Sequence, residues 1–227
     1  MPSTAQVAQQ SKIYVSGTPG ANITITGITK AAKAVVTAVN TLAAGDVVIF
    51  GAVTGMPEIN GLLGIVQAAP TGASFTVAID STGFAAVGTA GICTPQTFSK
   101  IGNVQDFSPD GGSVNVIEVT NTDSTAKEKR PGLQDNGGAT LSFHSDDTDP
   151  GQLALIALRA SQSVGVFKQV YPGGIKIRAY QAIVNKLAEP AIGVDKVLTS
   201  SASINSGGIS ATPMPCVAAT ASMENSS

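Results

Sequence analysis

The chain has 227 residues, of which 43% are hydrophobic and only 12% are charged, and its formal net charge is −2. The apolar content is enough for a folded core and excludes a chain that is disordered throughout. The 13 basic residues form no run, so the chain lacks the phosphate-neutralising cluster that tight binding of DNA or RNA requires.

Neither a membrane helix nor a disulfide framework is indicated. No stretch reaches the roughly 18 apolar residues of a membrane helix. The first residues lack a basic segment followed by an apolar run, so we expect no signal peptide. Cys93 and Cys216 lie far apart without motif spacing. We predict two unpaired thiols, as is usual in a protein made in the cytoplasm, with a disulfide as the open alternative.

Short runs rich in Val, Ile and Thr fill the first part of the chain. Residues 1–11 have the composition of a flexible arm, and KIYVSGTP (12–19) predicts a short strand that ends in a turn. Residues 24–94 contain only five charged residues, and their short apolar runs alternate with turn signals. This pattern favours a small, tightly wound β-barrel over helices.

A charged segment separates two predicted strands in the middle of the chain. SVNVIEVTN (113–121) and GATLSFHSD (138–146) both alternate apolar with polar residues, as half-buried strands do. Residues 119–138 show no apolar periodicity, so we predict a long, solvated loop, which in a compact domain is either disordered or functional. The loop concentrates the charged residues Asp123, Lys127, Glu128, Lys129, Arg130 and Asp135.

One good helix candidate follows, TDPGQLALIALRASQ (148–162). Thr148 or Asp149 can serve as the N-cap, and Pro150 suits the first turn, where its missing N–H costs nothing. We expect this helix to pack on a sheet and also to touch something else, because its apolar surface is wide. Helical spacing unites Leu153, Ile156, Ala157 and Ala160, and Leu155 and Leu158 widen this face.

The last part of the chain predicts three more strands. VGVFKQV (164–170) and IKIRAYQAIVNKL (175–187) read as a hairpin or a bent strand pair, and VDKVLTSSASINS (194–206) as the last strand. The residues from about 211 onward have the composition of a loose end. We therefore predict a mainly β fold with one packed α-helix.

The sequence offers little for catalysis. His144 is the single histidine, on the polar face of a predicted strand, and no nucleophile or orienting carboxylate is placed beside it. The acidic run at 145–149 lacks the glycine and closing glutamate of a calcium loop, and acidic residues before a helix are explained by its dipole. We expect neither an enzyme nor a bound metal or cofactor.

The order of these elements resembles the major tail tube protein of lambda-like, non-contractile, long-tailed bacteriophages. The matching pieces are KIYVSGTPG, IGNVQDFSPDGGSVNVIEVTN, the charged loop, ATLSFHSD, DPGQLALIALRA and KQVYPGGIKIRAYQAIVNKLAEP. The resemblance implies a tail-tube β-sandwich or barrel. Its residues are 1–23 and 95–212, with 213–227 as a flexible tail.

Residues 24–94 resemble a different module, the small β-barrel named after the first catalytic-cysteine half-domain of ubiquitin-activating enzymes. ITGITKA, GDVVIF, GMPEINGLLGIV and SFTVAIDSTGF carry this likeness. The resemblance implies a decoration domain inserted after the first strand of the tube domain, and no ubiquitin chemistry.

Tail tube subunits of this family form hexameric rings that stack into a hollow tube. The resemblance therefore implies a structural virion protein, assembled in the host cytoplasm, that self-assembles and contacts other tail proteins such as the tape measure, the tail terminator and the baseplate or tip. Phage DNA would pass through the lumen without specific binding, which suits the absence of a basic patch. No membrane contact is implied.

Three rival classes remain open at this point. A small hydrolase is disfavoured by the missing site, and an activity that is lost when His144 is replaced by alanine would revive it. A receptor- or carbohydrate-binding β module would need exposed aromatic platforms, and the chain has no Trp and three Tyr. A tail terminator or connector would share the fold but form single rings.

The resemblance also changes the interpretation of the charged loop. In the family, the equivalent loop reaches the neighbouring ring, which implies that Asp123, Lys127, Glu128, Lys129, Arg130 and Asp135 make contacts between subunits. One exposed ion pair contributes only about 0–1 kcal/mol, but a ring repeats each pair once per subunit.

Overall fold

The fold was analysed in a computed structural model that describes residues 11–67, 71–121, 125–172, 176–190, 196–210 and 214–215. Contacts divide the chain into two units. Unit 1 comprises residues 1–101, 166–180 and 209–227, and unit 2 comprises 102–165 and 181–208. The predicted arm at 1–11 lies outside the described residues except for residue 11.

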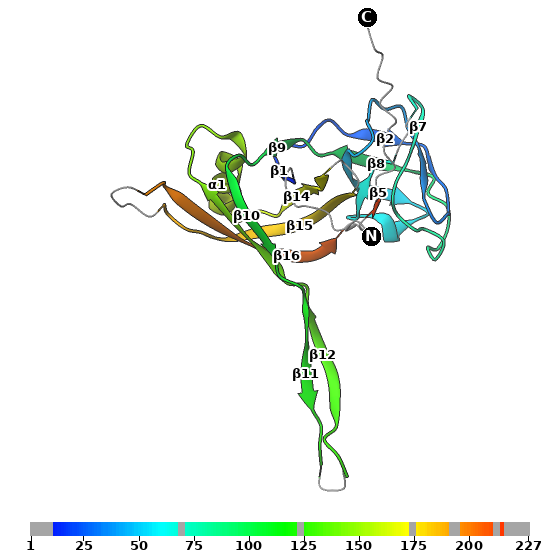
Figure 1. Cartoon of the computed structure of the whole chain (residues 1–227). Helices are drawn as coiled ribbons and strands as arrows, with labels where there is room; N and C mark the ends of the chain where they lie inside the picture. The colour runs from blue at the N-terminus through cyan, green and yellow to red at the C-terminus, as the bar shows by residue number, and fades with distance from the viewer. Residues whose placement is uncertain are drawn as a thin grey trace, which may run out of the picture. The chain divides into compact units, whose positions relative to one another are not determined.

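The chain is mainly β with a single α-helix among the described residues, as predicted (Figure 1). The strands are β1 (Lys12–Ser16), β2 (Ile23–Ile25), β3 (Gly27–Ile28), β4 (Val35–Thr37), β5 (Val47–Thr54), β6 (Leu63–Ile65), β7 (Ser74–Thr76), β8 (Ala90–Pro95), β9 (Phe98–Lys100), β10 (Val104–Pro109), β11 (Ser113–Glu118), β12 (Lys129–Asp135), β13 (Gly138–His144), β14 (Gly165–Val170), β15 (Lys176–Leu187), β16 (Thr199–Ser210) and β17 (Met214–Pro215). The helices are the 3₁₀ turn η1 (Pro57–Ile59) and α1 (Pro150–Ser161).

The largest sheet has eight strands in the order β10-β13-β16-β15-β14-β1-β9, with β17 paired to β15. Strand β1 pairs antiparallel with β14, with Val15 opposite Phe167, and antiparallel with β9, with Tyr14 opposite Lys100. The sheet is open, so β10 and β9 are edge strands.

Within unit 1, residues 23–95 form the β2–β8 region. It consists of a four-stranded sheet, β2-β8-β5-β6, and a three-stranded sheet, β3-β4-β7. Both sheets bury one apolar cluster, in which Phe50, Phe75 and Met56 are almost fully enclosed. The packing is tight, because a Cβ at Gly64 would lie 2.8 Å from the Phe50 ring. The short Val- and Ile-rich runs of the sequence therefore form strands, as expected.

A second cluster joins the β2–β8 region to the rest of unit 1. Val47, Leu63, Ile65 and Ala78 of this region pack with Val166, Ile177 and Ala179 of β14 and β15. Burying a Val or Ile side chain stabilises a fold by about 1.5–3 kcal/mol. This contact is therefore part of the core of unit 1.

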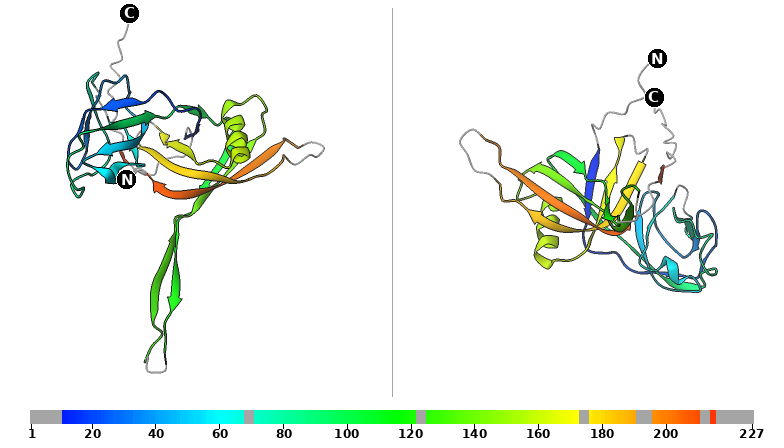
Figure 2. Two further views of the ribbon diagram at one scale, coloured as in Figure 1. Left: turned by 180° about the vertical axis from the view of Figure 1, so that it is seen from behind. Right: turned by 90° about the horizontal axis from the view of Figure 1, so that it is seen from below.

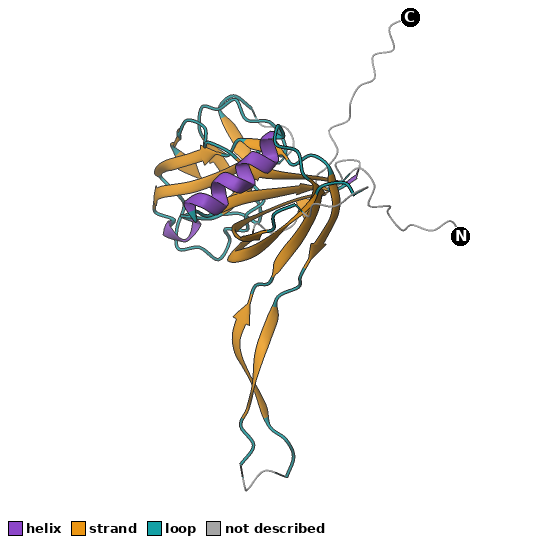
Figure 3. Ribbon diagram, turned by 90° about the vertical axis from the view of Figure 1, so that its left-hand side faces the viewer, coloured by secondary structure: helices purple, strands orange, loops and turns teal. Residues whose placement is uncertain are grey.

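Unit 2 contains α1 and the strands that it covers (Figure 3). On β13, Leu141 and Phe143 are buried while Ser142 and His144 are partly exposed, which confirms the predicted alternation. Helix α1 begins after Asp149, whose side chain accepts a hydrogen bond from the Gln152 amide. The predicted capping residue and helix are thus confirmed.

The predicted packing face of α1 is wrong. Leu153 and Ile156 are 47% and 50% exposed, and Ala157 and Ala160 are exposed too. The helix instead buries Gly151, Gln152 and Leu155. Leu158 packs close to Gly165, where a Cβ would lie 2.5 Å from its side chain. Helical spacing predicted burial centred on Leu153 and Ile156, whereas the structure buries the side of the helix that carries Leu155.

Two further expectations need correction. Residues 129–135 are not loop but strand β12, which pairs with β11. Within the predicted loose end, β17 (Met214–Pro215) pairs with Lys176 and Ile177 of β15; residues 211–213 and 216–227 lie outside the described residues.

Candidate functional site

The charged segment belongs to a two-stranded hairpin, β11–β12, that extends away from β10 and β13 (Figures 1 and 2). Its register places Glu118 opposite Lys129, Ile117 opposite Arg130 and Ser113 opposite Asp135. A bulge lies between Val114 and Val116. We call the described residues 113–121 and 125–135 the hairpin arm.

The structure places most of the predicted contact residues on this arm. Lys129, Arg130 and Asp135 lie on β12, and Lys127 and Glu128 precede it; all five are exposed. Asp123 lies outside the described residues. No ion pair joins the five to one another or to any other described residue. Their charges are therefore available to a partner.

The arm also carries apolar side chains that sequence reasoning did not assign to the site. Val114, Val116, Ile117 and Leu133 are 47%, 57%, 49% and 89% exposed. An isolated two-stranded hairpin is at best marginally stable in water, and exposed apolar residues that cluster on one element mark an interaction site. The signal in the sequence is the apolar–polar alternation of 113–118, which predicts a strand but does not identify the surface that covers its apolar side chains.

Glycines fix the base of the arm. The Asp110 amide donates to the Gly138 carbonyl at 2.8 Å, and Gly137 has a φ of 71°, which favours glycine. A Cβ at Gly112 would collide with the Asp135 carbonyl, and one at Gly137 would lie 2.6 Å from the Asp110 carbonyl. The chain therefore leaves and re-enters the large sheet at adjacent points.

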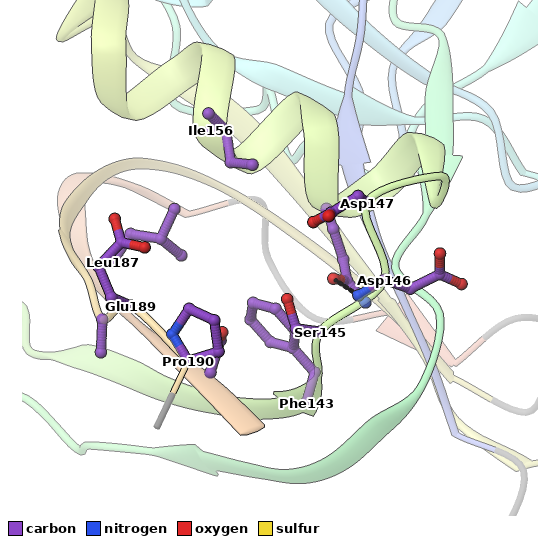
Figure 4. A pocket seen from close by; sticks show the side chains of 11 residues that line it. Phe143, Ser145, Asp146, Asp147, Ile156, Leu187, Glu189 and Pro190 are labelled. Carbon is purple, nitrogen blue, oxygen red and sulfur yellow. Dashed lines mark hydrogen bonds between the residues drawn. The ribbon is translucent and has the colours of Figure 1, made fainter. Parts of the chain in front are cut away.

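At the other end of β13, a pocket of about 360 Å³ lies beside α1 (Figure 4). Its apolar walls are Phe143 of β13, Ile156 of α1, and Leu187 and Pro190 at the end of β15. Its acidic residues are Asp146, Asp147 and Glu189. All these residues belong to unit 2.

The side chain of Gln152 organises this end of β13. Its Oε1 accepts from the Asp146 amide at 2.9 Å, and its Nε2 donates to the His144 carbonyl at 2.9 Å. Gln152 is only 4% exposed, and burial of an amide side chain is tolerated when its hydrogen bonds are made. These bonds fix the turn that carries Asp146 and Asp147.

Asp146 is held in its ionised form. Its Oδ1 accepts hydrogen bonds from the Thr148 hydroxyl at 2.7 Å and the Thr148 amide at 3.0 Å. These bonds, the hydroxyl first, lower the pKa of Asp146 below its ordinary value. Because both donors are neutral, the negative charge of the carboxylate remains uncompensated.

His144, at the end of β13, is partly exposed. Its Nε2 accepts from the Gln105 amide at 3.0 Å, and its Nδ1 is buried without a hydrogen-bond partner. Within the described part of the chain, no carboxylate is hydrogen-bonded to the ring. Among the residues that the structure describes, no group of three or more His, Cys, Asp or Glu could hold a metal ion.

Two further titratable side chains, Cys93 and Lys168, lie in unit 1. Cys93 is buried and unpaired, and burial raises the pKa of its thiol to about 11. Lys168 lies over the rings of Phe98 and Tyr14, at 4.5 and 5.3 Å from their centroids. Burial lowers the Lys168 pKa, and the charge of Asp46 opposes that shift. Cys216 lies outside the described residues.

No helix in the described part of the chain has the length and apolar character needed to span a membrane. In a comparison with protein families, the family model described as phage tail tube protein, TTP, matches residues 54–211. The match begins at the end of β5, includes the arm, α1 and the pocket, and ends just after β16. A search of curated proteins finds no match.

Proposed function

Because this chain belongs to the phage tail tube protein family, we propose that it is the major tail tube subunit, copies of which assemble into stacked hexameric rings around a conduit for phage DNA. Membership of the family makes it a structural component of the bacteriophage tail. The ring, its six-fold order and the passage of DNA are the proposed part. We further propose that assembly takes place in the host cytoplasm.

The open eight-stranded sheet is the observation that carries this proposal. Its edge strands β10 and β9 present backbone N–H and C=O groups that no strand of the described chain pairs on their outer side. Unpaired edges favour association with another strand. Because the two edges differ, their association is head-to-tail, and such a contact closes into a ring when the rotation between copies allows.

The charge of the chain suits a conduit. A channel through which DNA slides must not hold the phosphates, and retention depends on Lys and Arg contacts. The chain has 13 basic and 15 acidic residues, so stacking copies adds no net positive charge.

The hairpin arm supplies the proposed contact between rings. Lys127, Glu128, Lys129, Arg130 and Asp135 are exposed and unpaired by one another, and Asp123 is assigned to the same contact from the sequence. Each exposed ion pair contributes about 0–1 kcal/mol. Repetition around a ring multiplies that small contribution.

Negative-stain electron microscopy of the purified protein, with mass measurement in solution, tests the proposal. We expect rings with a hollow centre that stack into tubes at high concentration or after addition of tail initiators. Single rings that never stack would favour a tail terminator or connector. A protein that stays monomeric under all these conditions would contradict the proposal.

A further inference from the structure

We propose that the pocket beside α1 receives the hairpin arm of a second copy of the chain. The pocket is the one lined by Phe143, Ile156, Leu187, Pro190, Asp146, Asp147 and Glu189. This inference rests on the proposed tube assembly, and it names the surface to which the arm binds.

The pocket offers an apolar floor with an acidic rim (Figure 4). Its volume of about 360 Å³ falls in the roughly 300–1,000 Å³ range of binding pockets. Ile156 is 50% exposed and Leu153, one turn earlier, is 47% exposed. Half-exposed aliphatic residues next to a concave site are typical of a surface that becomes buried on binding.

The acidic rim carries charge that this subunit does not neutralise. Asp147 and Glu189 are exposed, and neither makes an ion pair with a described residue. Asp146 is hydrogen-bonded only to neutral donors, Thr148 and Asn103. Figure 4 shows the Asp146 carboxylate turned away from the apolar floor. The exposed carboxylates of Asp147 and Glu189 beside that floor favour an occupant that combines positive charge with apolar surface.

The arm has that combination. Its cations Lys127, Lys129 and Arg130 lie within three residues of one another, and Ile117 stands directly opposite Arg130 in the register. Long cationic side chains lay their apolar stems on apolar surface while the charged head meets a carboxylate. The guanidinium of Arg130 also suits a bidentate contact with a carboxylate.

The geometry of unit 2 requires that the arm come from another copy. The arm leaves β13 at Gly138, whereas the pocket begins at Phe143 near the opposite end of the strand. At about 3.3 Å per residue these points are roughly 17 Å apart. Figures 1 and 3 show the arm extending away from α1. An arm at one end and its receptor at the other give a head-to-tail contact, which propagates from copy to copy when it does not close into a ring.

Charge exchange tests this contact. One variant carries Lys129→Glu and Arg130→Glu in the arm, a second carries Asp147→Lys and Glu189→Lys in the pocket, and a third carries all four changes. Lys30→Glu with Lys33→Glu, two exposed lysines of the β2–β8 region, is the control, because it changes the net charge by the same amount as the arm variant. Circular dichroism melting verifies folding, and electron microscopy counts tubes.

We expect the arm variant and the pocket variant each to lose tubes, the control to keep them, and the fourfold variant to regain them. Wild-type tubes together with a fourfold variant that forms none would overturn the docking site and leave the proposed function intact. Pocket-variant tubes equal to those of the wild type would also overturn it. A monomeric wild type would contradict both proposals.

Discussion

At the residue scale, Asp149 joins two segments of unit 2 with one carboxylate. Its Oδ1 accepts from the Gln152 amide at 2.8 Å, and its Oδ2 from the Gly102 amide at 3.1 Å. One bond caps α1 and the other fixes the start of the segment that leads into β10. A single side chain therefore positions both the helix and an edge of the large sheet.

Asp149→Ala should lower the free energy of unfolding. Loss of an N-cap costs about 0.5–2 kcal/mol, and the Gly102 amide loses its acceptor as well. Urea denaturation measures the change. Asp149→Asn is the control, because its carbonyl oxygen still caps the helix, and it should cost less. Equal stability of the Ala variant and the wild type would contradict this role.

The Asp146 carboxylate gives a prediction about pH. Its pKa is lowered in the folded protein, first by the Thr148 hydroxyl and then by the Thr148 amide. A lowered pKa contributes stability above the unfolded-state value, and that stability is lost as the pH falls through the folded-state value. Thr148→Val should therefore raise the pKa of Asp146 and make stability fall less steeply with acid.

Nuclear magnetic resonance titration of the carboxyl groups measures this shift. Thr82→Val is the matched control, because Thr82 lowers the pKa of Asp80 through the same pair of bonds. It should raise the pKa of Asp80 and leave that of Asp146 unchanged. An unaltered Asp146 pKa in Thr148→Val would show that the hydroxyl bond is not the main cause.

At the element scale, sequence patterns correctly predicted the elements whose apolar side chains are buried within the same subunit. Helix α1 was predictable from Asp149 and Pro150, and β13 from the alternation that buries Leu141 and Phe143. Strand β12 was missed because all but one of its residues are exposed, so no periodicity records its structure. Pro131 also argued against a strand at this position. Proline is tolerated beside a β-bulge, and Pro131 lies opposite Val116, next to the bulge of the hairpin.

Deletion of residues 113–136 should separate folding from assembly. The three remaining glycines, Gly111, Gly112 and Gly137, can join β10 to β13, because three-residue hairpin loops are common and the Asp110 amide already bonds to the Gly138 carbonyl. We expect a folded subunit, with an unfolding midpoint near that of the wild type, that forms no tubes.

Circular dichroism and electron microscopy measure the two properties of this variant. A control that replaces the arm with a polar hairpin of equal length should behave like the deletion. Normal tubes from either variant would show that the arm is dispensable for stacking.

At the scale of the whole molecule, the boundary of the β2–β8 region remains a prediction. The sequence suggested a separate decoration domain at 24–94. The contacts of Val47, Leu63 and Ile65 with Val166 and Ile177 were not predictable, because apolar residues on a strand do not identify the surface that covers them. Family resemblance indicated the order of the tube strands but not this shared core.

Deletion of residues 24–94 should therefore destabilise what remains. It would uncover Val166 and Ile177, at about 1.5–3 kcal/mol for each side chain. We expect the deletion to lower the melting temperature and to cause binding of a hydrophobic dye. Both the decrease in melting temperature and the dye binding should be smaller when Val166→Thr and Ile177→Thr accompany the deletion. A deletion variant as stable as the full chain would show that the region is an independent decoration.

Of the candidate site, the charged arm could be predicted from the sequence but the pocket could not, because the pocket forms from elements that are distant in the chain. The sequence marked Lys127, Lys129 and Arg130 by their unusual concentration of charge. It could not mark the pocket, because Phe143, Ile156 and Leu187 meet only after β13, α1 and β15 have folded. Surfaces that depend on tertiary contacts carry no local periodicity.

The glycine-rich base of the arm affects how the sequence of such a protein can evolve. Both ends of the arm meet at Asp110 and Gly138. The length and sequence of the arm can therefore change while the eight-stranded sheet keeps its hydrogen bonds. Insertions in an exposed segment of this kind cost little stability. A peptide inserted in this segment should therefore leave the subunit folded, and the segment is the place where we expect related phages to differ most.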